Sequence, residues 1–156
     1  QSFWLVVHVS IAIIATGVLI VGAVATVLQL ARDYRDSGTA WLQRFRWMEA
    51  VPEPAKLEAL AFRLHAVGFV LWTFTVMAGA VWAEHSWGRY WGWDPKETWS
   101  LVTWFVYATL LHARFMRGWH GNRIAILSIV GFLAVLFTYF GVNYLPGLHS
   151  YGAMGQ

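Results

Sequence analysis

The sequence contains no cysteine and few charged residues. Because it has no thiol, the chain has no disulfide, no thiolate metal site and no C-x-x-C-H motif of its own. Charged side chains make up 12% of the 156 residues, half of the roughly 25% that soluble domains carry. Hydrophobic residues make up 58%. These proportions argue against an ordinary soluble domain and predict that residues 1–156 form one transmembrane domain.

The positive charge of the chain has an explanation other than nucleic-acid binding. The formal net charge is +3 and the isoelectric point is near 9.5. Eight of the 11 lysines and arginines fall within or beside two short segments, 32–57 and 116–123, which separate apolar runs. That distribution is typical of membrane topology. We therefore expect a lipid bilayer, and no nucleic acid, among the partners.

Four apolar runs are candidate membrane spans. The first covers 9–31, the second 57–83, the third runs through 101–112, and the fourth covers 124 to about 144. About 20 apolar residues cross the ~30 Å hydrocarbon core of a bilayer. The predicted fold is therefore all-α, a polytopic bundle of about four transmembrane helices with a tryptophan-rich external loop before the third.

The connector 32–57 combines basic and aromatic residues. Its apolar side chains recur at helical spacing opposite the arginines: Trp41, Leu42, Phe45 and Met48. This pattern predicts a short helix that lies in the membrane interface. We expect Pro52 and Pro54 to end that helix, because proline is not tolerated in a helix interior.

The stretch from Trp87 to Trp99 reads W-G-R-Y-W-G-W-D-P-K-E-T-W and holds four of the 11 tryptophans. Its second half has the pattern of a helix start. Asp94 is the predicted N-cap, Pro95 the first helical residue, and Glu97 the side chain that reaches back to the cap. Capping explains both acidic residues better than acid–base chemistry does, so no catalytic residue is predicted.

Four spans and three connectors place both chain ends on one side of the membrane. The positive-inside rule assigns the two basic connectors to the cytoplasm. The tryptophan loop and both chain ends are then external. His8 lies at the start of the first span and His149 follows the last one. Both histidines are therefore expected at the same face as the loop.

His8 and His149 are candidate metal ligands. Imidazole is a common axial ligand of haem iron, and two facing histidines would give six-coordinate iron. Taken alone, each is better explained as a polar group at the membrane interface. Taken together, at the same face and on either side of the tryptophan loop, they support the two explanations equally. A zinc site has little support, because cysteine is absent and the histidines lack the close spacing of zinc ligands.

The tryptophan loop is a candidate surface for a flat ligand. Trp87, Trp91 and Trp93 offer stacking faces and N–H donors, and the two intervening glycines let the backbone approach a ligand closely. The aromatic belt of membrane proteins explains Trp82 and Trp87, but not the whole cluster. Either Arg89 or Lys96 would pair with a carboxylate such as a haem propionate.

The remaining histidines are less informative. His112 lies about 27 Å from the predicted N-cap of its helix, at ~1.5 Å per residue. An ionisable residue inside a span is a functional candidate, but His112 equally suits an interfacial position. His65 lies at a comparable depth in the second span and is its candidate partner. His85 and His120 are predicted to be solvated loop residues.

The motif W-G-R-Y-W-G-W-D-P-K-E-T-W, followed by W-F-V-Y-A-T-L-L-H-A-R, resembles the WWD signature of the haem-handling proteins of cytochrome c maturation. In particular the chain resembles the CcsA/ResC-type subunit of the system II cytochrome c synthase, a haem lyase. The resemblance extends from the first histidine to the L-H-S-Y-G tail. It implies cytochrome c biogenesis in the bacterial plasma membrane or the thylakoid membrane.

The resemblance also implies the ligand and the residues that hold it. Haem b would lie on the external loop between two histidines that match His8 and His149. His112 matches a histidine thought to hold haem nearer the cytoplasm, whose usual partner lies in an earlier span that this sequence does not contain. Other residues implied in haem binding belong to the loop: Trp87, Arg89, Trp91, Trp93 and Asp94. The implied partners are apocytochrome c, a ResB-type membrane subunit and thiol-reducing proteins.

Two other functions and one further expectation stay open. A haem transporter without attachment activity would share the same external site. An electron-transfer b-type cytochrome would usually place its histidine pairs inside the bundle. Because the chain starts at Gln1, without methionine and at the edge of a span, we expect it to be the C-terminal part of a longer polypeptide.

Overall fold

The computed structural model describes residues 2–141, and this part of the chain is helical with no strand. Four α-helices follow one another: α1 (Ser2–Asp36), α2 (Pro54–Trp87), α3 (Pro95–Arg117) and α4 (Asn122–Tyr139). A short 3-10 helix, η1 (Arg46–Ala50), lies between α1 and α2. The predicted all-α helix bundle is confirmed.

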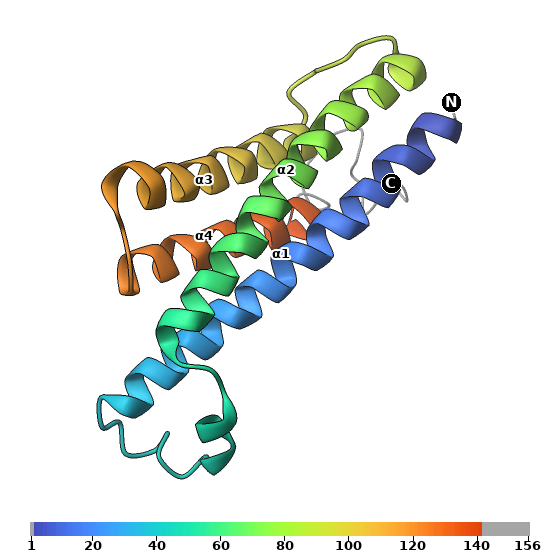
Figure 1. Cartoon of the computed structure of the whole chain (residues 1–156). Coiled ribbons are helices and arrows are strands. Elements are labelled where there is room, and N and C mark those ends of the chain that lie inside the picture. The colour runs from blue at the N-terminus through green and yellow to red at the C-terminus, as the bar shows by residue number, and fades with distance from the viewer. Residues whose placement is uncertain (1, 142–156) are drawn as a thin grey trace.

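The helices form two antiparallel pairs that pack against each other. α1 lies along α2, and the shorter α3 and α4 form the second pair, which crosses the first (Figure 1). The beginning of α1 lies near the end of α2, where the chain turns into the tryptophan loop (Figure 1). Leu19, Trp72, Tyr107, Leu110 and Val135 are buried between the pairs. The packing therefore brings the start of the first helix close to the tryptophan loop.

Three of the helices, α1, α2 and α4, are long and apolar enough to cross a membrane. Their exposed surfaces carry large apolar side chains such as Val24, Phe74 and Leu133, which suit contact with lipid. The chain is therefore that of an integral membrane protein. α3 has 23 residues but is more polar and is not among these three, so its role as the remaining span stays a prediction.

The start of α3 follows the sequence prediction. The Asp94 carboxylate accepts a hydrogen bond from the backbone N–H of Glu97 at 2.8 Å, and the Glu97 carboxylate accepts one from the N–H of Asp94 at 3.4 Å. Pro95 is the first helical residue. This reciprocal capping fixes the direction in which α3 leaves the tryptophan loop.

The connector between α1 and α2 differs in part from the prediction. Its short helix is the 3-10 helix Arg46–Ala50, and the residues before it form turns. Leu42 and Met48 are buried, whereas Trp41 is 63% exposed, so the apolar side chains do not share one face. The prediction that Pro54 ends this helix is wrong. Pro54 begins α2, because proline suits the first helical position, where no N–H is needed.

Candidate functional site

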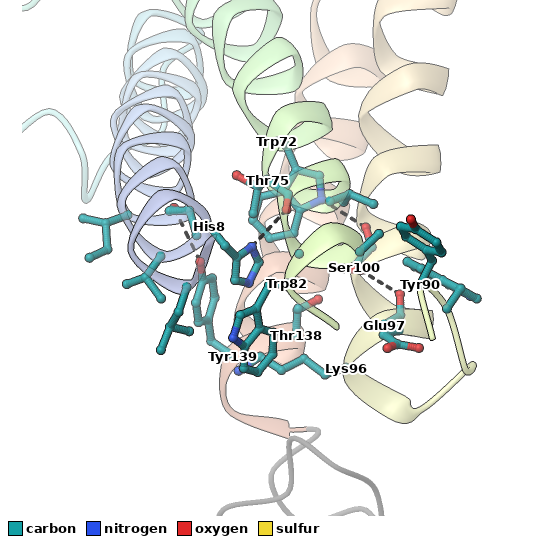
Figure 2. Close-up of a pocket in the computed structure, with 18 residues that line it drawn as sticks. His8, Trp72, Thr75, Trp82, Tyr90, Lys96, Glu97, Ser100, Thr138 and Tyr139 are labelled. Atoms are coloured by element: carbon teal, nitrogen blue, oxygen red, sulfur yellow. Dashed lines mark hydrogen bonds between the residues drawn. The ribbon is translucent and has the colours of Figure 1, made fainter. Parts of the chain in front are cut away.

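A cavity of about 200 Å³ lies where the first turns of α1, the end of α2 and the tryptophan loop meet. All four α-helices and the loop contribute to its walls, which are mostly apolar. Its lining residues include one imidazole, that of His8, and two charged side chains, those of Lys96 and Glu97. Figure 2 shows His8 on α1 and Lys96 at the start of α3, with Trp82 and Tyr139 near them.

His8 is held in place from α2. Its Nδ1 lies 3.0 Å from the carbonyl oxygen of Thr75. A carbonyl only accepts hydrogen bonds, so Nδ1 is the donor, and in the neutral imidazole the lone pair is then on Nε2. The imidazole also stacks parallel to Trp82, with ring centroids 6.2 Å apart. Metal-binding histidines are commonly oriented by such a hydrogen bond from the other ring nitrogen.

One face of α2 forms the wall behind His8. Trp72, Thr75, Gly79 and Trp82 recur at intervals of three or four residues, and all line the cavity. A Cβ atom on Gly79 would lie only 2.8 Å from Cε1 of His8. Sequence reasoning assigned Trp82 to the aromatic belt and overlooked Thr75 and Gly79. The sequence signal that indicates them is the recurrence of these four residues at helical spacing, which places them on one face of α2.

The loop tryptophans pack edge to face in two pairs, one of which includes Trp82 of α2. Trp82 packs on Trp87 at 4.8 Å between centroids, and Trp91 packs on Trp93 at 5.6 Å. Of the three loop tryptophans predicted to bind a ligand, Trp91 lines the cavity, whereas Trp87 and Trp93 do not line it and each packs on a tryptophan that does. The indole N–H of Trp91 is buried and has no hydrogen-bond partner within residues 2–141. A buried donor without a partner suits a site that receives a polar ligand.

Trp93 has an unusual backbone conformation. Its φ is +57°, in the left-handed region, and it is the one non-glycine residue with a positive φ among those described. For a bulky residue this conformation costs about 1–3 kcal/mol and is typical of ligand-binding and switch segments. The Trp93 side chain is 66% exposed. The fold therefore maintains a strained loop that presents an indole at its surface.

Arg89 stabilises the loop from within. Its guanidinium lies 2.7 Å from the Glu97 carboxylate and 5.2 Å from the centroid of the Trp87 ring. The Gly92 N–H donates to the second Glu97 oxygen at 2.7 Å. Gly92 also lies against the guanidinium, because a Cβ there would come within 2.3 Å of Arg89 Cζ. Arg89 is not among the residues that line the cavity.

Lys96 occupies a different position. It lines the cavity, and its Nζ lies 5.6 Å from the centroid of the Tyr139 ring. The Tyr139 hydroxyl is in turn 2.8 Å from Oγ1 of Thr16, which joins α4 to α1. Burial lowers the pKa of Lys96, which lies ahead of the apolar part of α3, and the negative charge of Asp94 opposes this shift. A cation is thus placed at the cavity wall.

The structure does not bring His112 together with His65, and it does not test His149. His149 lies outside the described residues. His112 is exposed near the far end of α3, whereas His65 is buried against Tyr107, with ring centroids 5.6 Å apart. The expected pairing of His65 with His112 is therefore not found. His65 Nε2 is buried without a hydrogen-bond partner in the described part of the chain.

The remaining two histidines lie beside acidic side chains. His120 is exposed, as expected, but its Nδ1 lies 3.1 Å from Glu58, which also pairs with Arg114. This cluster links the start of α2 to the turn between α3 and α4, at the end of the bundle opposite the cavity. His85 lies 3.2 Å from Glu84 near the end of α2. Neither histidine lines the cavity.

Comparison with known proteins identifies the family. The family model described as cytochrome C assembly protein matches residues 1–149. The cytochrome c biogenesis protein CcsA of Chlamydomonas reinhardtii is 43% identical over 160 residues, which cover 97% of this chain and 41% of that protein. The CcsA of Gloeobacter violaceus is 37% identical over 199 residues, with 97% and 59% covered. The chain thus spans about half the length of these curated relatives. Since the match extends over nearly all of its residues, the chain belongs to the cytochrome c assembly protein family.

Proposed function

We propose that this chain holds haem at the outer face of the membrane for covalent attachment to apocytochrome c. The observation that carries the proposal is the position of His8. Its Nδ1 donates to the Thr75 carbonyl and its ring stacks on Trp82, and these contacts hold the imidazole at the wall of a mostly apolar cavity. Membership of a family whose relatives are named for cytochrome c biogenesis supports the same function.

Each predicted site residue has a role in this proposal. His8 and His149 are the two axial ligands of the haem iron. Trp91 contacts the macrocycle from the cavity wall, and its N–H, which has no partner among residues 2–141, donates to a polar group of haem. Trp87 and Trp93 extend the aromatic surface on either side, while Arg89 and Asp94 maintain the loop through Glu97. His112 binds haem on its way to this site.

The chemistry of attachment requires positioning more than acid–base catalysis. Addition of a thiol across a vinyl group forms one carbon–sulfur bond, and the thiol hydrogen passes to the neighbouring vinyl carbon. No oxidant or reductant is consumed. The two thiols come from the C-x-x-C-H motif of the substrate, since this chain has none. The fixed His8 imidazole and the indole surface hold the vinyl edge in reach. The histidine of the incoming motif then replaces one axial ligand, which couples release to completed attachment.

The proposed topology and partners follow from charge and from the family. The basic connectors 32–57 and 116–123 lie in the cytoplasm, so the tryptophan loop and both ends of the chain are external. Residues 1–156 act as one haem-handling domain of a haem lyase in the bacterial plasma membrane or the thylakoid membrane. A ResB-type membrane subunit completes the complex, and thiol-reducing proteins keep the apocytochrome reduced.

An attachment assay tests this function. The protein, purified with its membrane partner, is incubated with haem and reduced apocytochrome c, and covalent haem is measured after denaturation. We expect the wild type to form thioether bonds and His8→Ala to lose most of this activity. His85→Ala is the matched control, because His85 lies on the same side of the bundle but outside the cavity. Haem binding without any thioether product would instead support a transporter.

A further inference from the structure

We infer that Lys96 binds a carboxylate group of the ligand in the cavity, and so determines how that ligand is rotated about the His8 axis. The inference rests on the proposed function, in which the ligand is haem and the carboxylate is a propionate. The sequence alone left Arg89 and Lys96 as equal candidates for this contact. The geometry of the loop separates them.

The Arg89 guanidinium is held inside the loop by its ion pair with Glu97. Its partner Glu97 is only 7% exposed, and the two groups are 2.7 Å apart. Turning Arg89 toward a ligand would leave a buried carboxylate without its counter-charge, which is strongly unfavourable. The close contact with Gly92 also leaves the guanidinium little room to move. Arg89 therefore maintains the loop and does not reach the cavity.

Lys96 is placed at the cavity wall by two elements. The capping box at the start of α3 fixes the turn on which Lys96 lies. Its ammonium lies over the ring of Tyr139, and Tyr139 is anchored to α1 through Thr16. Figure 2 shows the Lys96 side chain directed toward Tyr139, in the same cavity as His8.

The charge distribution around the cavity favours an anion at this point. Glu97 is the acidic residue among the lining side chains, and its two oxygens accept from Arg89 and from the Gly92 N–H. The positive end of the α3 dipole lies in the same turn as Lys96. Burial lowers the pKa of Lys96 and the negative charge of Asp94 opposes this shift, and a bound carboxylate would add to the effect of Asp94.

Two contacts from different helices would orient a haem molecule. His8 extends from α1 and fixes the iron, while Lys96 extends from α3 and fixes one edge of the macrocycle. In haem b the two propionates lie on the edge opposite the vinyl groups. A propionate held by Lys96 therefore turns the vinyl groups away from α3. Lys96 is a ligand-binding residue that selects which edge is presented to the substrate.

A pair of porphyrins tests the inference. The affinity of the purified protein is measured for haem and for haem dimethyl ester, in which both carboxylates are capped. We expect the wild type to bind haem about tenfold or more tightly than the ester, because the ester cannot accept a charge-assisted hydrogen bond at a carboxylate. Lys96→Met should bind both porphyrins with nearly equal affinity, and Lys96→Arg should keep most of the preference. Lys56→Met is the matched control, because Lys56 is the chain's other lysine and is exposed at the start of α2.

Three results would overturn the inference. The first is equal affinity of the wild type for haem and its dimethyl ester, which would show that no carboxylate is recognised. An unchanged preference in Lys96→Met, together with loss of the preference in Arg89→Gln, would transfer the role to Arg89. If the wild type binds neither porphyrin, the proposed function itself fails. The His8-dependent absorption spectrum of bound haem verifies that each variant is folded around the site.

Discussion

Substitution of Gly79 by alanine tests whether α2 positions the His8 imidazole. The new Cβ would lie 2.8 Å from Cε1 and 3.0 Å from Nδ1 of His8. Carbon atoms in contact are about 3.5–4.0 Å apart, so the ring must move by roughly 0.7 Å or more. A movement of that size away from α2 lengthens the 3.0 Å hydrogen bond to the Thr75 carbonyl beyond its useful range.

The expected energetic cost combines three effects. Overpacking costs about 1–3 kcal/mol, and the lost hydrogen bond costs about 0.5–1.5 kcal/mol. Alanine regains about 1 kcal/mol as a better helix former than glycine. The net loss of stability is therefore about 0.5–3.5 kcal/mol. Haem bound by the variant should also show weakened axial ligation, because the imidazole is no longer held in one orientation.

Gly17→Ala provides the matched control. Gly17 lies within α1 and is exposed, and a Cβ there would meet no atom within 4 Å. This variant gains helix propensity without any collision, so its stability should equal or exceed that of the wild type. The assays are thermal unfolding in detergent and the absorption spectrum of bound haem. If Gly79→Ala matches Gly17→Ala in both assays, the proposed positioning of His8 by α2 is refuted.

Four further predictions concern the loop and the other histidines. His149→Ala should remove one axial ligand and recover in part with added imidazole; an unaltered spectrum would contradict its assignment. Trp93→Gly should relieve the left-handed strain, so thermal stability should hold while haem occupancy falls; a parallel loss of both would indicate a structural role. Glu97→Ala should lower the free energy of unfolding by about 1–3 kcal/mol, measured by denaturant titration, because Arg89 and the Gly92 N–H lose their partner. His112→Ala should reduce haem occupancy without altering the spectrum of the remaining haem; unchanged occupancy with full activity would exclude it from haem handling.

Features that depend on neighbouring residues were predictable from the sequence. The N-cap at Asp94 and its reciprocal contact with Glu97 involve residues three positions apart, so the local pattern was sufficient. The long apolar helices followed in the same way from length and composition. Pro54 was misassigned because proline is compatible both with the end of one helix and with the first position of the next.

Features that depend on how helices are rotated against one another were not predictable. Residue counting gave His65 and His112 similar depths, but it does not give the face of the helix on which each lies. One of them is buried and the other exposed. Likewise, the choice between Arg89 and Lys96 as anion-binding residue depends on where the loop folds over α3. In the sequence both cations lie near the tryptophans. The packing shows that Lys96 lines the cavity and that Arg89 does not.

The central claim is that the His8 Nε2 atom is a ligand of haem iron. The most direct measurement is the absorption spectrum of reduced haem bound to the purified protein, compared between the wild type and His8→Ala with and without imidazole. The account predicts a low-spin, six-coordinate spectrum in the wild type, its loss in His8→Ala, and its partial return when imidazole is added. An identical low-spin spectrum in the wild type and in His8→Ala would contradict the account.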